Sequence, residues 1–491
     1  MNLNLAECFF QQAEQQPGHP LILGQELDDK TSYAEFQAIV ESLSGKLRDA
    51  GVNPGDNVGL HYQSGRDYIA FVYALWNCRA CVTPLPFELT ATEKQQIFQY
   101  IHIDAAISSV RLLDQLVGAT TTAPEAIPLT EQAVYLKLNA QCEAPPQLAG
   151  INAAFIRFTS GTTGDAKGVV LSHESIFERI LAANQILEIG AKDRILWLLS
   201  MDYHFAVSIV AYLTFGASII LPKNGFGITL LTAASRHRAT LIYGSPTHYA
   251  MMTQDDSNAS LPPELRLAIV TTTALHEDAA YHFYQRFGRV LNETYGIIEL
   301  GLPAINVSQS RDKQGSVGRM LPDYALRLDC PPGQQQGEIT IKGKGMLDAY
   351  YSPWRSREAL LQQNDGWFRT GDLGRLDADG FLYIVGRSKE MISVGGMKFF
   401  PEEVETVLEK HPAIQSATVF GVKEKSSWGE PAWSHLVLKE NEDQPSDDQL
   451  RTYCKQYLAS HKIPGRFLWV GHLSYTASGK KIRNPDKLRK T

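Results

Sequence analysis

The sequence has no long hydrophobic run and no excess of basic residues. Its longest strongly apolar stretch, residues 209–221, is interrupted by Thr214, Gly216 and Ser218, and a membrane-spanning helix needs about 20 apolar residues. The formal net charge is −7, whereas nucleic-acid-binding proteins usually carry a clear basic excess. The first 16 residues contain no basic region followed by a small-residue cleavage site, so we expect no signal peptide. The sequence therefore predicts no membrane span and no nucleic-acid partner.

Cysteine is also scarce, with six residues in a chain of 491. This number is too low for a disulfide-stabilised scaffold, and it favours a reducing, cytoplasmic location. Cys78 and Cys81 form a C-x-x-C pattern inside the apolar stretch 71–85, but no second pair follows at zinc-binding spacing. We therefore interpret both as buried core thiols, and a redox or metal site is the less favoured alternative.

Apolar runs that alternate with helical patterns fill the first two thirds of the chain. Ser32 and Glu35 form a capping box that starts a helix, and Gly51 ends it. Buried strands are predicted at residues 153–158, 195–199, 218–221, 240–243 and 267–270. Strands separated by amphipathic helices indicate an α/β fold with doubly wound parallel sheets.

The pattern changes near residue 335. Strand-like runs at 338–342 and 381–385 are joined by turns rich in glycine and aspartate, and we expect a small β-barrel-like part there. After Gly386 a small α+β unit follows, with a helix beginning at Pro401 and strands at 417–422 and 434–439. We therefore predict an N-terminal domain, 1–386, and a C-terminal domain, 387–491.

A loop rich in glycine and hydroxyl groups is the strongest local signal. It follows a buried strand and contains Thr159, Ser160, Gly161, Thr162, Thr163, Gly164, Lys167 and Gly168. Its glycines allow backbone N–H groups to converge on a polyanion, and its hydroxyls and lysine add donors. The Walker A pattern does not fit it. The alternative is a hydroxyl-rich surface turn.

This loop resembles the T-S-G-T-T-G-x-P-K-G loop of the adenylate-forming superfamily, apart from Ala166 in place of proline. That superfamily comprises acyl- and aryl-CoA synthetases, adenylation domains that load carrier proteins, and luciferases. The resemblance implies that the loop, with Lys167, holds the phosphates of ATP.

Three further motifs follow in the order of that family. Tyr295-Gly296-Ile297-Ile298-Glu299 resembles Y-G-x-T-E and implies that Tyr295 stacks on adenine and that Glu299 binds Mg²⁺; Ile298 replaces the threonine. The segment from Gly366 to Asp372 resembles G-W-x-x-T-G-D, whose aspartate binds the ribose hydroxyls. The segment from Gly386 to Glu390 resembles the domain junction, which implies that Arg387 contacts the ribose and that Lys389 is the hinge.

The last motif lies near the C-terminus. Thr476-Ala477-Ser478-Gly479-Lys480, with Arg483 downstream, resembles P-x-T-x-S-G-K-x-x-R with Ser474 in place of proline. The resemblance implies that Lys480 is the catalytic lysine that bridges the acid and the α-phosphate. Without it, Lys480 reads as one charge in a solvated basic tail.

Together these motifs imply an enzyme that activates a carboxylic acid as its acyl-AMP, with ATP and Mg²⁺, and passes the acyl group to a thiol. The thiol belongs to coenzyme A or to a carrier protein. The acid pocket of the family maps to segments that include Tyr203, His204, Phe205, Tyr243, Tyr249, Thr272 and Gly301. The aromatic residues favour an aromatic or apolar acid over an amino acid, although Asp202 lies close to the position of an amine-binding aspartate. A nucleotide-binding relative without ligase activity is the alternative, supported by Ala166, Ile298 and Ser474.

Overall fold

The computed structural model divides the chain into two compact units by its internal contacts. The first unit comprises Met1–Leu326 and Ile341–Phe368, and the second comprises Arg327–Thr340 and Arg369–Thr491. The structure describes residues 2–24, 26–120, 124–160, 166–272, 275, 277–388, 390–394, 397–422, 431–475 and 481–483. No helix in these ranges is long and apolar enough to cross a membrane.

One sheet of the first unit is formed by strands from both ends of that unit. In spatial order its strands are β16 (Arg319–Met320), β15 (Gly301–Ile305), β14 (Asn292–Ile297), β13 (Leu267–Val270), β12 (Leu241–Gly244), β10 (Arg194–Trp197), β11 (Ser218–Ile220), β1 (Pro20–Leu23) and β2 (Lys30–Ser32). The central pairs are parallel, and the edges β14–β15–β16 and β1–β2 are antiparallel. The predicted strands are therefore confirmed here within a residue or two.

The other large sheet contains the strands that flank the predicted phosphate loop. Its order is β20 (Arg355–Ser356), β19 (Ala349–Tyr350), β9 (Ala166–Ser172), β8 (Ala153–Ser160), β4 (Cys81–Pro84), β3 (Asn57–His61), β5 (Ala105–Ser109), β7 (Ala133–Lys137) and β6 (Glu125–Thr130). β3, β4, β5 and β8 run parallel, and the remaining pairs are antiparallel. Cys78 and Cys81 are buried and free, which agrees with core thiols.

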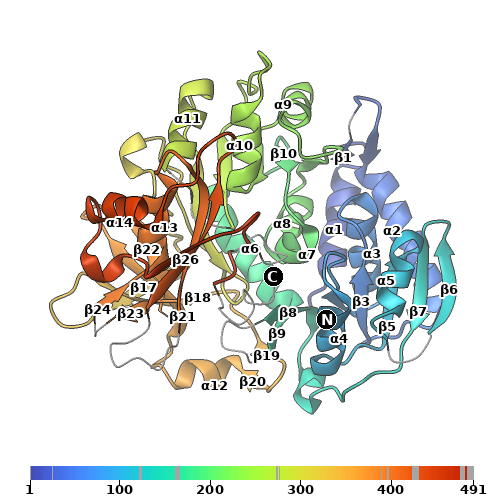
Figure 1. The fold of residues 1–491 in the computed structure, drawn as a ribbon. Helices are drawn as coiled ribbons and strands as arrows, with labels where there is room; N and C mark the ends of the chain where they lie inside the picture. The colour runs from blue at the N-terminus through green and yellow to red at the C-terminus, as the bar shows by residue number, and fades with distance from the viewer. Residues whose placement is uncertain are drawn as a thin grey trace. The chain divides into compact units, whose positions relative to one another are not determined.

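Helices join the strands of both sheets (Figure 1). They are α1 (Leu5–Gln15), α2 (Tyr33–Asp49), α3 (Arg66–Asn77), α4 (Ala91–Tyr100), α5 (Leu113–Val117), α6 (His173–Leu187), α7 (Met201–His204), α8 (Ile209–Thr214), α9 (Gly227–Arg236), α10 (Pro246–Gln254), α11 (Glu277–Phe287) and α12 (Arg357–Gln362), with 3-10 turns η1 (Val110–Leu112), η2 (Pro146–Gly150), η3 (Phe205–Val207) and η4 (Arg311–Lys313). The capping box of Ser32 and Glu35 is present at the start of α2. It does not open the first helix of the chain, because α1 precedes it with Asn4 as its N-cap.

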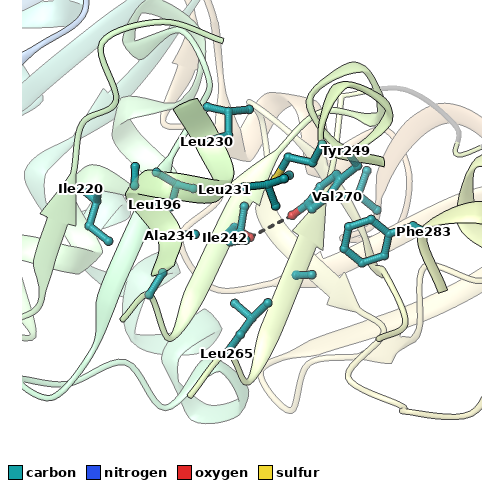
Figure 2. Packing of buried hydrophobic residues seen from close by; sticks show 14 of the residues in the cluster. Leu196, Ile220, Leu230, Leu231, Ala234, Ile242, Tyr249, Leu265, Val270 and Phe283 are labelled. Carbon is teal, nitrogen blue, oxygen red and sulfur yellow. Dashed lines mark hydrogen bonds between the residues drawn. The ribbon is translucent and has the colours of Figure 1, made fainter. Parts of the chain in front are cut away.

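The core between the first sheet and helices α9 to α11 is apolar and tightly packed. Leu230, Ile242, Val270 and Phe283 contribute to it, each buried (Figure 2). Tyr249 is 1% exposed, and its hydroxyl donates to the carbonyl oxygens of Ile242 and Ile269. Tyr249 is thus a core residue whose polar end is satisfied within the sheet.

The described residues of the second unit form three small sheets and two helices. Most of the four-stranded sheet β17 (Tyr324–Asp329), β18 (Gln336–Gly343), β21 (Phe368–Leu376) and β22 (Leu382–Arg387) belongs to it, and this sheet occupies the predicted β-barrel-like part. β23 (Ile392–Val394) pairs with β24 (Met397–Phe399), and β25 (Ile414–Gly421), β26 (Ala432–Leu438) and β27 (Arg466–Trp469) form the last sheet. Helices α13 (Pro401–Glu409) and α14 (Asp447–Lys455) and the turn η5 (Ser460–Lys462) complete this unit. Its core joins Val404 and Leu408 of α13 to β25 and β26, as expected for the α+β part.

Candidate active site

The predicted phosphate loop connects two antiparallel strands. β8 and β9 pair as far as Ser160 and Ala166, so the two ends of the loop lie opposite each other at the end of the sheet. Gly161, Thr162, Thr163 and Gly164 lie outside the described residues, as do the side chains of Thr159, Ser160 and Lys167. The contacts of the loop with phosphate therefore stay a prediction.

The Tyr295–Glu299 motif forms one strand and the turn of a β-hairpin. Tyr295 lies on β14 and is 6% exposed, and residues 298–300 turn the chain into β15. Gly296 is required because a Cβ atom there would lie 2.5 Å from the carbonyl oxygen of Gly301. Gly301 itself has a φ of +83°, a conformation that glycine adopts without strain. The two glycines thus form the hairpin that presents Glu299 at its turn.

The carboxylate of Glu299 is oriented by a tyrosine from β19. The Tyr350 hydroxyl donates to Oε1 of Glu299 at 3.0 Å, and the backbone N–H of Leu347 donates to the Glu299 carbonyl oxygen at 2.7 Å. Burial, together with the charge of Glu299, raises the pKa of Tyr350, so the tyrosine remains a neutral donor. Glu299 is partly exposed, and its second oxygen can therefore face a ligand.

Arg179 of α6 holds this turn from the interior. It is 1% exposed, and its guanidinium donates to the carbonyl oxygens of Ile298 at 3.0 Å and of Gly345 at 2.6 and 2.9 Å. Burial lowers the pKa of Arg179 to about 10, so the group stays charged at neutral pH. Sequence reasoning did not identify Arg179 or Tyr350, because no local motif marks either residue.

Glu299 fits the requirements of a magnesium ligand. Mg²⁺ is usually held by one or two carboxylates together with phosphate oxygens and water, not by an all-protein cage. The described residues contain no group of three or more metal-ligating side chains. The structure offers one oriented, partly exposed carboxylate at this turn, which suits a metal that also binds a nucleotide.

Several residues of the predicted acid pocket contact other aromatic side chains. Trp197 stacks on Tyr243 with ring centroids 5.2 Å apart, and His204 lies edge-on to both rings. Phe205 is 1% exposed and stacks on Phe155, so it belongs to the core beneath this region. Thr272 has a φ of +84°, which a β-branched residue adopts at a cost of about 1–3 kcal/mol and mostly near functional sites.

Two charged residues lie beside these aromatic rings. Asp202 on α7 is 1% exposed and accepts hydrogen bonds from the hydroxyls of Tyr68 at 3.1 Å and Ser200 at 3.2 Å. Burial, with repulsion from Glu88, raises the pKa of Asp202 to about 7. Arg157 on β8 donates to the carbonyl oxygen of Tyr203 at 2.8 Å, and its guanidinium lies 4.9 Å from the centre of the Tyr203 ring.

The second unit brings together the predicted ribose-binding residues. Asp372 on β21 and Arg387 on β22 are directly opposite each other in the sheet, and Nε of Arg387 lies 2.9 Å from Oδ1 of Asp372. Asp372 is 4% exposed. The two oxygens of the Asp372 carboxylate are hydrogen-bond acceptors, which suits hydroxyl groups as partners.

Lys480 and Lys389 lie outside the described residues, but the chain directly after Lys480 is firmly held. Glu405 of α13 pairs with Lys481 at 3.2 Å and with Arg483 at 2.9 Å, and it also accepts from the backbone N–H of Val419. Burial opposes the charge of Arg483, yet the carboxylates of Glu405, Glu402 and Glu390 outweigh this and raise its pKa. The segment 481–483 is therefore fixed to α13 by a network of buried charges.

Family profiles match both parts of the chain. The profile described as AMP-binding enzyme matches residues 9–351, which is more than half of the sequence. The chain belongs to the AMP-binding enzyme family. The profile of the AMP-binding enzyme C-terminal domain matches residues 403–480, so the match includes Lys480.

Individual relatives of this AMP-binding enzyme span nearly its whole length. Sulfoacetate–CoA ligase of Cupriavidus necator is 28% identical over 504 residues, covering 98% of this chain and 96% of the relative. 2-Succinylbenzoate–CoA ligase of Bacillus subtilis is 26% identical, with coverages of 94% and 93%. The solved structure of o-succinylbenzoate CoA synthetase from Bacillus subtilis with its acyl-adenylate intermediate superposes with a TM-score of 0.81 at 25% identity, covering 98% and 97% of the two chains.

These similarities confirm the predicted superfamily and the predicted fold class. They also confirm the predicted reaction, in which an AMP-forming acid–thiol ligase uses ATP to convert a carboxylic acid into its acyl-AMP and then into a thioester. Nothing in them supports the alternative of a nucleotide-binding relative without ligase activity.

Proposed function

We propose that this AMP-binding enzyme joins an organic acid other than an amino acid to coenzyme A, with Mg²⁺ as its metal. The observation that supports this proposal is the turn at Glu299, which hydrogen bonds from two side chains hold in place. Its carboxylate is oriented by Tyr350, and its backbone is held by Arg179. An oriented carboxylate of this kind suits a reaction that depends on positioning and neutralising phosphate charge.

In the first step an oxygen of the acid attacks the α-phosphorus of ATP, and the bond to pyrophosphate breaks. Bound Mg²⁺ would neutralise charge on the phosphates, and Glu299 is the residue that would hold it. We assign Thr159, Ser160, Gly161, Thr162, Thr163, Gly164 and Lys167 to the pyrophosphate leaving group. Because backbone N–H groups and a lysine are donors only, they suit a leaving group that gains negative charge.

The remaining nucleotide contacts are assigned to Tyr295, Asp372 and Arg387. Tyr295 is a planar aromatic residue on a rigid hairpin strand, which suits stacking on adenine. The ion pair of Asp372 and Arg387 suits two neighbouring ribose hydroxyls. Lys480 is assigned to the reaction centre, and Lys389 to a hinge about which the domain 387–491 turns before thioester formation; both assignments rest on motif resemblance.

The side chains beside the predicted pocket indicate which class of acid the enzyme binds. An amino acid needs a free, ionised carboxylate for its ammonium group. Asp202 does not offer one, because Tyr68 and Ser200 already occupy it and burial raises its pKa to about 7. The aromatic residues Trp197, Tyr243 and His204 instead suit a flat or apolar carbon skeleton. We keep Tyr203, Thr272 and Gly301 as predicted pocket residues, whereas Phe205 packs in the core beneath them.

Coenzyme A is proposed as the acceptor because the curated relatives named above are CoA ligases. Its thiolate attacks the acyl carbon of the acyl-AMP, and AMP leaves. A carrier protein presents the same thiol and remains the competing acceptor. A cytoplasmic location is proposed from the six free cysteines, which persist in a reducing compartment.

The test is acid-dependent exchange of pyrophosphate into ATP, followed by AMP release on addition of coenzyme A or of a carrier protein with a free phosphopantetheine thiol. We expect exchange with non-amino acids and product release with coenzyme A. Glu299→Gln keeps the shape of the side chain and removes its charge, and we expect exchange to fall about 10²–10³-fold. Exchange with amino acids alone, or release only with the carrier protein, contradicts the proposal.

A further inference from the structure

Arg157 is a charged residue on a strand face that otherwise packs against the apolar core. It lies on β8, the strand that leads into the phosphate loop, and Phe155 two residues earlier stacks on Phe205 in the core. Because alternate residues of a strand share a face, Arg157 projects on the side of the sheet where Phe205 packs. Its contacts are with Tyr203, which belongs to the predicted acid pocket.

The guanidinium of Arg157 forms no ion pair in the described part of the chain, although the carboxylates of Glu299 and Asp202 attract its charge. Its guanidinium has one hydrogen bond, to the Tyr203 carbonyl oxygen, and its Nε atom is buried without a partner. Neither carboxylate is hydrogen-bonded to Arg157: Asp202 accepts from Tyr68 and Ser200, and Oε1 of Glu299 accepts from Tyr350. Burial lowers the pKa of Arg157, which shows that the charge is held at a cost. The Arg157 side chain is half-buried, and a partly desolvated charge with an unpartnered donor is stabilised by an anionic ligand.

We propose that Arg157 binds a second anionic group of the acid substrate, so that the enzyme selects acids with two negative charges. This inference rests on the proposed function of the site. The guanidinium pairs with the planar or trigonal oxygens of a carboxylate or sulfonate through parallel N–H donors. Arg157 is assigned to the acid and not to the nucleotide because its contacts are with Tyr203. The group it binds is distinct from the carboxylate that attacks ATP.

A panel of matched acids tests this role. Each dicarboxylic acid of three to eight carbons, aliphatic or aromatic, is paired with its monoamide, which has nearly the same shape and one negative charge fewer. The wild-type enzyme is expected to show a kcat/KM for acid-dependent pyrophosphate exchange about 10- to 100-fold higher for the diacid of its best pair. Arg157→Met should remove this preference by lowering the value for the diacid, while the value for the monoamide stays within about threefold.

Two controls separate selectivity from structure. Arg48→Met replaces an exposed arginine that donates to the Asn77 carbonyl oxygen, and it should leave the preference for the diacid unchanged. Arg157→Met should unfold at the same or a higher temperature, because it removes a desolvated charge. Arg157→Lys, which keeps the charge but not the fork of donors, should retain part of the preference.

The outcomes are distinct. Equal use of diacid and monoamide by the wild type overturns the inference and leaves the proposed ligase intact. An equal loss of activity on both acids in Arg157→Met, with a lower unfolding temperature, shows a structural arginine and also overturns it. Absence of exchange with every acid rejects the proposed function, and the inference with it.

Discussion

Replacing Asp202 by asparagine should remove a pH dependence that this buried carboxyl group imposes on the stability of the first unit. Asp202 is 1% exposed. Burial and the charge of Glu88 raise its pKa, whereas the hydrogen bonds from Tyr68 and Ser200 and the charge of Arg157 lower it. Asparagine has the same shape and can still bind both hydroxyls, so the substitution changes the charge and little else.

The direction of this pH dependence follows from which state, folded or unfolded, binds the proton more tightly. The ordinary pKa of an aspartate is 3.8, and that of folded Asp202 is about 7. Between these values the folded state binds the proton more tightly than the unfolded state does, so the free energy of unfolding decreases as pH rises. The gap between the two pKa values corresponds to at most about 4 kcal/mol. This penalty is absent below about pH 4, grows to about pH 7 and is constant above that.

Urea unfolding of both proteins at pH 5, 6, 7 and 8, followed by tryptophan fluorescence, measures this difference. Asp202→Asn should become progressively more stable than the wild type from pH 5 to pH 7, by a few kcal/mol in total. Asp67→Asn changes a more exposed carboxylate that pairs with Arg66, and it should follow the wild-type curve. Parallel pH curves for the wild type and Asp202→Asn would refute the reasoning.

Two further predictions concern residues that position the catalytic groups. Arg179→Met leaves two buried turn carbonyl oxygens without donors, so we expect a loss of about 2–4 kcal/mol in urea unfolding. The Mg²⁺ concentration for half-maximal pyrophosphate exchange should also increase, and an unchanged Mg²⁺ dependence would reduce Arg179 to a structural role. Glu405→Gln weakens the network around Lys481 and Arg483 by about 2–3 kcal/mol. We expect it to slow adenylation more than thioester formation from supplied acyl-AMP, and equal loss in both assays contradicts this.

Local signals in the sequence identified most of the secondary structure. The capping box at Ser32 and the proline at 401 mark helix starts that the structure contains, because caps and helix periods act over a few residues. Helix α1 was missed, although Asn4 offers an N-cap and Leu5, Phe9 and Ala13 repeat every four residues. Its signal was present but weaker than that of α2.

Contacts of the site between residues far apart in the sequence could not be predicted from such local signals. Tyr350 reaches Glu299 across 51 residues, and Arg179 reaches Gly345 across 166. Such contacts depend on how strands and helices pack against one another in the folded protein, and no periodicity or residue spacing in the sequence indicates them. Arg157 gave no signal either, because an arginine next to Phe158 and Thr159 reads as an ordinary strand residue. The lack of an ion pair to Arg157 in the described part of the chain becomes visible only when the surrounding side chains are in place.

The pairing of β1 with β11 has a consequence for synthesis on the ribosome. Ile22 lies opposite Ile219 in this parallel pair, so the first strand of the protein waits for a partner that is translated about 200 residues later. At about 5–20 residues per second, the delay is on the order of 10–40 s. The strands from β3 to β9 can pair with one another during that time, because all of them lie between residues 57 and 172, and among the described pairs only β9 has a later partner, β19. The apolar segment Pro20–Leu23 has only β2 as an early partner, so its other edge stays open until β11 is translated, and an unpaired strand edge is prone to aggregation during synthesis.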